Sequence, residues 1–431
     1  MRRLLIIADD LSGAADCANA CMSSGLSATV TLDDSDHHLD SEVISVDCDT
    51  RHLDPHEAAE RVTEVMDAYA SDATDLLIFK KVDSTLRGNV GAELSAALRE
   101  RRQVAHGNRR IVSVMAPAFP AGGRTTVDGH QMVHGKPLHE TEMWIHNRLP
   151  GPAHIPTLLS QAGLEPATLG LELVRSGNAQ LQNAMLRLAE TADVLVCDVV
   201  TDDDLRAIAE ASLALGRQTL WAGSAGLAHH LPHVAGLTGE MTAPEPREIL
   251  DGPTLFVIGS MSSVSHVQSA RLATNTPITT IHVSPRVLLA GSGSPRWREI
   301  AAKAAASLQG GRDTLVKLDG GEWIDPLERR YLTNALGVMF APVGETVGAL
   351  VASGGETARA ILDRWGITSL QMVGEVEAGL PYSVARIGDR SLPVLTKAGA
   401  FGNPETLMRC WDFLNSLERH SNEVASEARK S

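Results

Sequence analysis

The segment LLIFKKVDSTLRGN, residues 76–89, joins an apolar run to a dense group of polar side chains. The apolar residues 76–79 predict a buried strand, and the polar residues predict a turn before a helix that carries Leu94 and Leu98 on one face. Strand, turn and helix form the repeating unit of an open α/β sheet, in which ligands bind at the carboxyl ends of the strands. The lysines, arginine, carboxylate and hydroxyls of this turn suit a small, anionic, hydroxylated ligand.

The same alternation runs through both halves of the chain. Amphipathic patterns at 58–69 and 181–190 predict helices. Short apolar runs predict further strands at residues 4–8, 43–46, 111–115, 194–197, 255–258, 279–283, 314–318, 349–352 and 371–373. We therefore expect an α/β fold of two domains, each a mostly parallel sheet flanked by helices, with the active site in a cleft between the domains.

Two segments interrupt the rhythm. Residues 122–156 are rich in Gly, His, Pro and Thr and are too long for an ordinary connection, which is typical of a functional loop. Residues 241–248 carry two prolines among polar and charged residues, as interdomain linkers do. We predict an N-terminal domain over residues 1–240 and a C-terminal domain over residues 252–431.

Composition limits the partners. The 431 residues are 43% hydrophobic, only 3% aromatic, and carry a formal net charge of −15, which argues against phosphate-backbone binding and base stacking. The five cysteines are scattered without a C-x-x-C, so no disulfide framework is expected. The chain starts without a signal-peptide pattern and has no apolar run of about 20 residues. We expect a cytoplasmic protein of small-molecule ligands, with no nucleic-acid or membrane partner, compatible with a homo-oligomer.

Polar residues follow the first two predicted strands. Asp9 and Asp10 end the first strand, where one carboxylate can cap the next helix while the other faces the cleft. Asp10 is a candidate to accept hydrogen bonds from substrate hydroxyls or to act as a general base. Arg51 follows the second strand, where it either grips a ligand carboxylate bidentately or lies on the surface.

The third turn supplies a second group of candidates. Lys80 and Lys81 are adjacent, so only one of them is expected to face the site. Alternation from an inward Asp83 favours Lys81. Val82 and Ser84 belong to the same segment, and the alternative is a solvated helix cap.

The long loop contributes Arg124, His130 and His134. The two histidines could suggest a metal pair, but no HEXXH motif and no neighbouring cysteine supports one. We favour a loop that organises or covers the substrate site.

The second half contains three glycine-bearing turns, each after a strand. Such turns let backbone amides and a helix N-terminus meet a phosphate, although tight turns between strand and helix need glycine anyway. Lys397 precedes the third turn and could reach phosphate oxygens. No Walker motif and no G-x-G-x-x-G occurs. The three turns lie at residues 259–265, 353–357 and 397–403, and together they favour nucleotide phosphates as ligands.

Together these motifs resemble the four-carbon acid sugar kinase family. The resemblance spans nearly the whole chain and rests on residues 7–14, 81–89, 122–126, 223–227, 259–260, 354–357 and 397–402. It implies an N-terminal sugar-binding domain and a C-terminal nucleotide-binding domain. It also implies phosphorylation of the C4 hydroxyl of a four-carbon sugar acid by ATP, with Mg²⁺. The sequence of residues 9–17 is most similar to that of the family members that act on D-threonate. D-erythronate and 3-oxo-tetronate are the alternative substrates.

Carried over by motif, the resemblance implies a set of substrate contacts and a set of ATP contacts. The implied ATP contacts are Ser260, Gly354, Gly355, Glu356, Thr357, Ala400, Phe401, Gly402 and Asn403. The implied substrate contacts are Asp10, Arg51, Lys81, Val82, Asp83 and Ser84. Asp10 and Asp83 are the catalytic candidates, and the choice between them stays open. An alternative of another class is a non-catalytic sugar-acid sensor with two lobes, which would bind no nucleotide.

Overall fold

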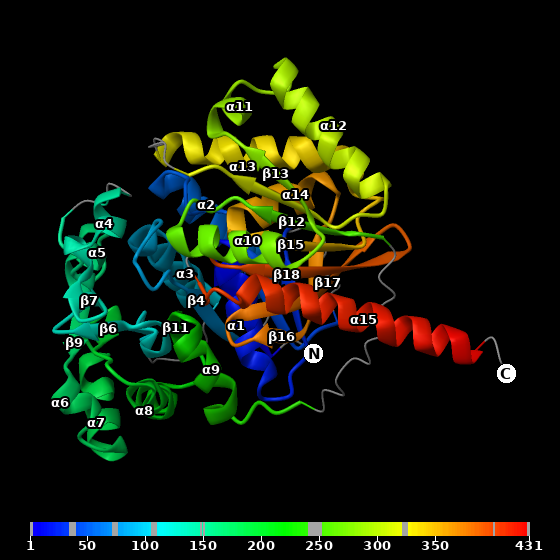
Figure 1. Ribbon diagram of the computed structural model, residues 1–431. Helices are drawn as coiled ribbons and strands as arrows, with labels where there is room; N and C mark the ends of the chain where they lie inside the picture. The colour runs from blue at the N-terminus through cyan, green and yellow to red at the C-terminus, as the bar shows by residue number, and fades with distance from the viewer. Residues whose placement is uncertain are drawn as a thin grey trace. The chain divides into compact units, whose positions relative to one another are not determined.

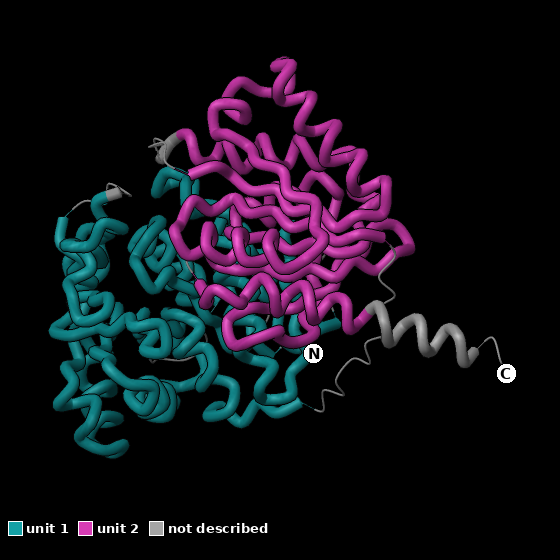
Figure 2. The backbone as a smooth tube through the Cα atoms, viewed as in Figure 1, with its two compact units in different colours: residues 1–241 teal, residues 242–431 magenta. Residues whose placement is uncertain are grey.

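The computed structural model describes residues 3–33, 40–70, 76–104, 110–146, 149, 151–239, 252–320, 326–399 and 401–428. The chain forms two compact units, Met1–Met241 and Thr242–Ser431, which Figure 2 shows in separate colours. The predicted linker at 241–248 lies outside the described residues.

The first unit runs from blue to green in Figure 1. It is built on a sheet of eight strands, all paired in parallel. In spatial order the strands are β2 (Ala28–Thr31), β3 (Val43–Asp47), β1 (Leu4–Ala8), β4 (Leu77–Lys81), β11 (Leu220–Gly223), β5 (Ser113–Ala116), β10 (Val194–Cys197) and β9 (Pro166–Leu169). Strands β1, β3 and β4 are neighbours, so their carboxyl ends meet at one edge of the sheet.

Helices cover both faces of this sheet because its strands are apolar on both sides. The larger core cluster joins strand residues such as Leu5 and Ile78 to Val62 and Leu98 on the helices. The helices of the unit are α1 (Leu11–Met22), α2 (Pro55–Ala70), α3 (Val90–Val104), α4 (Glu142–His146), α5 (Ile155–Gln161), α6 (Leu171–Val174), α7 (Asn178–Leu188), α8 (Asp202–Ser212) and α9 (Ala225–Val234).

The long loop of the first unit folds into a small antiparallel sheet. Its strands are β6 (Arg124–Val127), β7 (His130–Val133) and β8 (Lys136–Pro137). Gly123 adopts a φ of 71°, and the ring of His134 lies where a side chain at this position would be. The sequence predicts no regular structure here, because the strands are too short and polar to show a pattern.

The second unit has a sheet of seven strands, in the order β13 (Thr279–Val283), β14 (Thr314–Leu318), β12 (Thr254–Ile258), β15 (Ala349–Ser353), β18 (Arg390–Lys397), β17 (Leu380–Ile387) and β16 (Ser369–Glu377). The strands from β13 to β18 in this order pair in parallel, and β17 pairs antiparallel with both β18 and β16. The predicted α/β fold with mostly parallel sheets is confirmed. The sequence pattern does not reveal β17, whose first six residues are all buried and show no alternation.

The helices of the second unit are α10 (Ser263–Asn275), α11 (Pro285–Leu289), α12 (Pro295–Gln309), α13 (Pro326–Phe340), α14 (Gly355–Arg364) and α15 (Thr406–Ala428). Its core packs Phe256 and Leu395 of the sheet against Leu272 and Leu407 of the helices.

All five cysteines of the chain are buried and unbonded to one another, as the sequence predicts. Burial, the largest influence on each, raises the pKa of the Cys17 and Cys410 thiols to about 12. Cys21 shifts in the same direction.

Candidate functional site

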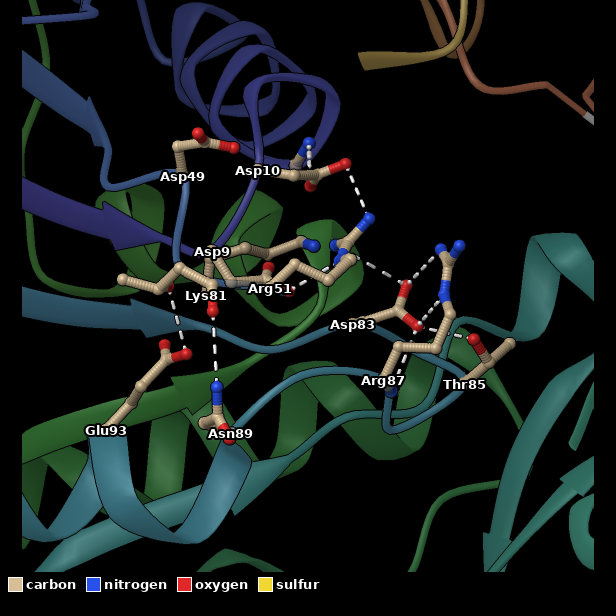
Figure 3. A network of polar contacts seen from close by, with 12 residues as sticks. Asp9, Asp10, Asp49, Arg51, Lys81, Asp83, Thr85, Arg87, Asn89 and Glu93 are labelled. Atoms are coloured by element: carbon tan, nitrogen blue, oxygen red, sulfur yellow. Dashed lines mark hydrogen bonds and ion pairs between the residues drawn. The ribbon is translucent and has the colours of Figure 1, made fainter. Parts of the chain in front are cut away.

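The polar segments after β1, β3 and β4 form one charged network at the edge of the first sheet (Figure 3). Parallel pairing brings the three strand ends together, although they are up to 74 residues apart in the sequence, from Asp9 to Asp83. Most of the network is buried: Asp9, Asp10, Lys81 and Asp83 are each 8% exposed or less. Charges in such a place must be paired or used, because burying an unpaired charge is costly.

Asp10 is the N-cap of α1. Its Oδ1 accepts a hydrogen bond from the backbone amide of Gly13 at 2.9 Å, which stabilises the first turn of the helix. Of the two adjacent carboxylates predicted to provide the helix cap, Asp10 is therefore the one that does so. Asp9 points elsewhere, and its buried Oδ1 has no hydrogen-bond partner among the described residues.

Arg51 connects the two aspartates. Its Nε donates to Asp9 Oδ2 at 2.8 Å and its Nη1 donates to Asp10 Oδ2 at 2.6 Å. Its Nη2 lies 4.0 Å from Asp83 Oδ1, and the side chain is 7% exposed. Burial disfavours the charged guanidinium, but Asp10, Asp9 and Asp83 outweigh burial and raise the pKa of Arg51 well above its usual value. The guanidinium is thus a permanent cation already held by protein carboxylates.

Asp83 organises the turn that follows β4. Arg87 donates to it from Nε at 2.7 Å and from Nη2 at 3.0 Å, and the Thr85 hydroxyl donates to Oδ2. Burial would favour the neutral acid, but Arg87 and Arg51 reverse that effect and hold the pKa of Asp83 well below its usual range. Leu86, in the same turn, has a φ of 55°, which is uncommon for a branched residue.

Lys80 and Lys81 point to different surroundings, as strand alternation predicts. Lys80 Nζ lies 2.7 Å from Glu93 Oε2 on α3, and both side chains are 2% exposed. Lys80 therefore belongs to the scaffold.

Lys81 lies beside the start of α1. A Cβ at Gly13 would lie 2.7 Å from Lys81 Nζ, so the absence of a side chain there makes room for the ammonium. Burial disfavours its charge, but Cys17, Asp9, Asp10 and Asp83 together raise the pKa of Lys81. The structure shows no hydrogen bond or ion pair from Lys81 Nζ to a described residue, so this cation is available to a ligand.

The remaining candidates of the first unit flank these groups. Val82 is buried and its backbone amide donates to Gly223 O at 2.7 Å. Ser84 is half-buried, and its carbonyl accepts from Gln131 Nε2 of β7 at 2.7 Å. This bond fastens the small sheet to the turn.

The small sheet shows no metal site. The rings of His130 and His154 lie 4.5 Å apart between centroids and are tilted by 39°, whereas His134 lies over Gly123. No group of three or more His, Cys, Asp or Glu suited to a metal occurs in the part of the chain that the structure describes.

In the second unit the three glycine turns also meet at one sheet edge, because β12, β15 and β18 are adjacent and parallel. Ser260 and Ser262 follow β12, and Ser262 caps α10 by accepting from the amide of Ser265 at 3.2 Å. Gly354, with a φ of 109°, precedes α14, whose N-terminus has no side-chain cap. Uncapped amides at a helix start are suited to a phosphate.

The turn after β18 packs closely on the turn after β12. A Cβ on Gly399 would lie 2.5 Å from Ser260 Oγ, and one on Gly259 would lie 2.1 Å from Thr357 Oγ1. Ser262 Oγ and Ser265 Oγ both donate to Gly399 O, at 2.9 and 2.5 Å. A side chain at Gly259 or Gly399 would therefore push these neighbouring turns apart.

The remaining candidates of this unit lie on its two later turns. Gly355 and Glu356 begin α14, and Thr357 is buried beside Gly259. Phe401 O and Asn403 O accept from Gln268 Nε2 at 3.0 and 2.9 Å. The residues between Lys397 and Asn403 include Gly402, with a φ of 89°, and Ala400, which lies outside the described residues.

Lys397 does not have the predicted role. Its Nζ donates to the carbonyls of Ala398, Gly399 and Phe401 at 2.9, 3.1 and 3.1 Å, and the residue is 2% exposed. Burial lowers the pKa of Lys397 to about 8. The expectation that it reaches phosphate oxygens is wrong in this structure, because the ammonium shapes the loop.

Sequence reasoning missed several polar residues that complete the two networks. In the second unit Ser262, Ser265 and Gln268 hold the glycine turns together. In the first unit Arg87 is the partner of Asp83. Asp9 is expected at the strand end from the sequence, but its pairing with Arg51 is not. The adjacency of Asp9 to Asp10 and the presence of Arg87 in the opening segment were the signals, but neither indicates a pairing.

Comparison with known proteins gives matches over nearly the whole chain. One family model, a sugar-binding N-terminal domain, matches residues 4–231, and a second, a nucleotide-binding C-terminal domain, matches residues 255–407. A D-threonate kinase of Cupriavidus necator is 39% identical over 94% of this chain and 97% of its own.

More distant relatives carry other substrate names. A 3-oxo-tetronate kinase of Burkholderia multivorans is 28% identical, over 92% of this chain and 94% of its own. A D-erythronate kinase of Heliobacterium modesticaldum is 26% identical, over 98% and 99%. Among solved structures, a Salmonella typhimurium protein titled a putative tRNA synthase shares the fold, with a TM-score of 0.76 at 21% identity over 95% of this chain and 99% of its own. Within the described residues, the helices are too short or too polar to cross a membrane.

Proposed function

Because the chain belongs to the four-carbon acid sugar kinase family and is a sugar-acid kinase that uses ATP, we propose that it phosphorylates the C4 hydroxyl of D-threonate. The observation that carries the proposal is the buried charged network at the ends of β1, β3 and β4, with Lys81 free to meet an anion. The 39% identity to a D-threonate kinase over nearly the full length favours this acid above the two other tetronates.

The network offers both kinds of contact that a sugar acid needs. Lys81 supplies a positive charge for the carboxylate, and the oxygens of Asp10 and Asp83 accept hydrogen bonds from hydroxyls. Arg51 donates to Asp10 and lies 4.0 Å from Asp83, so it acts on the substrate through the orientation of Asp10 as well as through its charge. Val82 and Ser84 would contact the acid through the backbone and hydroxyl of the turn.

Of the two catalytic candidates, we propose Asp10 as the group that takes the proton of the C4 hydroxyl. Asp83 Oδ2 already accepts from Thr85 and Arg87, and its pKa lies well below the usual range because the two arginines outweigh the effect of burial. It is a poor proton acceptor and a rigid hydrogen-bond acceptor. Phosphoryl transfer passes through a loose transition state, so a carboxylate that orients the hydroxyl meets most of the requirement.

The second unit would hold the nucleotide. The uncapped start of α14 at Gly354 and the hydroxyl of Ser260 are suited to phosphate oxygens. Gly259 and Gly399 let the neighbouring turns pack closely around Thr357 and Ser260. Mg²⁺ would arrive with the nucleotide, because this ion is usually held by substrate phosphates and water with one or two carboxylates. When bound it supplies positive charge against the polyphosphate.

Transfer requires the acid and the nucleotide to meet, and the cleft between domains that this implies stays a prediction from the sequence. Closure around both ligands would exclude water, which would otherwise hydrolyse ATP.

The test is a panel of D-threonate, L-threonate, D-erythronate and 3-oxo-tetronate, assayed for ADP release at matched concentrations. We expect D-threonate to give the highest kcat/KM. A higher value for another tetronate would replace the substrate assignment within the family. A protein that binds a tetronate but shows no thermal shift with ATP and Mg²⁺ would instead be the two-lobed sensor.

A further inference from the structure

Arg124, at the start of β6, is a cation that the charged network has not used. Its Nη1 donates to Gly122 O at 2.7 Å, while its Nε is buried and has no hydrogen-bond partner among the described residues. A buried donor of a charged group that makes no hydrogen bond costs free energy, so native structures rarely contain one without a reason. A missing partner is one such reason.

The fold places this guanidinium beside the turn of Asp83. Arg124 and Thr126 lie two residues apart on β6, so their side chains share a face of the small sheet. Thr126 Oγ1 donates to Gln131 Oε1 at 2.8 Å, and Gln131 Nε2 donates to Ser84 O. The face that carries Arg124 is thus fastened to the residue next to Asp83.

The charges of Asp83 and Arg87 also act on Arg124. Burial is the main influence and lowers the pKa of Arg124, while the charge of Asp83 acts in the opposite sense and that of Arg87 adds to the lowering. The arginine therefore interacts with the network without a direct ion pair to it.

The existing contacts of the network favour a further donor that can orient the carboxylate. The three carboxylates Asp9, Asp10 and Asp83 are matched by three cations, and two of these cations, Arg51 and Arg87, donate to protein oxygens. Arg51 already donates to Asp9 and Asp10, and Arg87 donates to Asp83 through Nε and Nη2, so both guanidinium groups are held by protein carboxylates. Lys81 is a point charge, which gives little control of orientation.

We propose that Arg124 binds the carboxylate of the sugar acid and sets the preference for acids over uncharged four-carbon polyols. The inference rests on the proposed function in that it takes a tetronate as the ligand. Its unpaired Nε gives it the donor geometry for a carboxylate oxygen. The contact made by Gly122 O holds the other side of the guanidinium, so that little side-chain freedom is lost when the ligand binds.

The experiment measures tetronate binding by calorimetry in the absence of ATP, for the natural protein and for Arg124→Gln, Arg124→Lys and Arg206→Gln. Arg206 is an exposed arginine of the same unit, paired with Asp203, and serves as the control. We expect Arg124→Gln to weaken tetronate binding about 10- to 100-fold, as loss of a charged hydrogen bond does, with partial recovery in Arg124→Lys and no change in the control. Affinity for the matching polyol, and for ADP with Mg²⁺, should stay within twofold.

If Arg124→Gln binds the tetronate with an affinity within twofold of the natural protein, the inference is overturned. An equal loss of affinity for the acid and for the polyol would also overturn it. Kinase activity is read separately. A protein that binds the acid through Arg124 but releases no ADP would contradict the proposed function and leave the inference standing. A protein that phosphorylates a tetronate equally well without Arg124 would support the proposed function and overturn the inference.

Discussion

Replacing Glu93 by glutamine should destabilise the first unit by about 3–5 kcal/mol, the usual cost of leaving one member of a buried ion pair alone. Lys80 Nζ lies 2.7 Å from Glu93 Oε2, and both side chains are almost completely buried. Thr50 Oγ1 donates to the other carboxylate oxygen at 3.0 Å. A glutamine has a single acceptor oxygen, so it cannot serve both donors, and its amide group would face one of them.

The double variant separates the pair from the site. Lys80 also donates to the carbonyls of Ile7 and Lys81, at 3.1 and 2.9 Å, so Lys80→Met alone should be at least as costly as Glu93→Gln. With both charges removed, no isolated charge is left. We expect Lys80→Met/Glu93→Gln to cost less than the sum of the single variants by about 2–3 kcal/mol.

The assay is equilibrium unfolding in urea, followed by tryptophan fluorescence and circular dichroism. Trp221 is buried on β11 and pairs in register with Phe79, next to Lys80, so its emission reports on this region. Glu64→Gln, on the exposed side of α2, is the control and should leave the midpoint unchanged. A loss below about 1 kcal/mol for Glu93→Gln, or additive single variants, would refute the reasoning, because neither fits a buried charge left unpaired.

Four further outcomes follow from the site and its surroundings. Asp10→Asn should lower kcat about 10²- to 10⁴-fold in the ADP-release assay; a smaller loss than Asp83→Asn gives would transfer the role of base to Asp83. Burial opposes ionisation of Asp193, but a backbone amide and two arginines lower its pKa to about 2. Its stabilisation is therefore complete above the unfolded-state pKa of about 3.9 and is lost as the pH falls towards 2, so Asp193→Asn should flatten the acid limb of thermal unfolding. Because burial lowers the pKa of Lys397 to about 8, the folded state loses this proton first, and stability should rise between about pH 8 and pH 10 in the natural protein but not in Lys397→Met. Gly399→Ala would place a Cβ 2.5 Å from a hydroxyl and should weaken ADP binding about tenfold or more by calorimetry, whereas unchanged affinity would remove this turn from the nucleotide site.

Local rules predicted much of the fold and the position of the candidate site. Period and flanking turns gave most strands of both sheets, and alternation separated Lys80 from Lys81 because it acts over neighbouring residues. The pairing of Arg51 with Asp9 spans 42 residues and depends on the order of strands in the sheet, which no local pattern contains.

The errors have the same origin. A lysine beside a glycine turn predicts a phosphate contact, but the path of the loop brings three carbonyls to the ammonium of Lys397. Arg87 and Asp83 pair inside a turn and not on a helix, so their spacing of four carries no signal. The left-handed backbone at Leu86 is likewise set by the contacts of the turn around it.

The burial of all five cysteines makes this chain convenient for site-specific labelling. A thiol reacts as its thiolate, and the raised pKa values that burial imposes on Cys17, Cys21 and Cys410 leave almost none of that form near neutral pH. Maleimide dyes should therefore not react with the natural cysteines while the protein stays folded. One cysteine introduced on an exposed position of each unit, for example at Arg206 and Tyr331, would accept a donor and an acceptor dye on an otherwise unreactive background. Energy transfer between the dyes would then record how the distance between the units responds to sugar acid and to nucleotide.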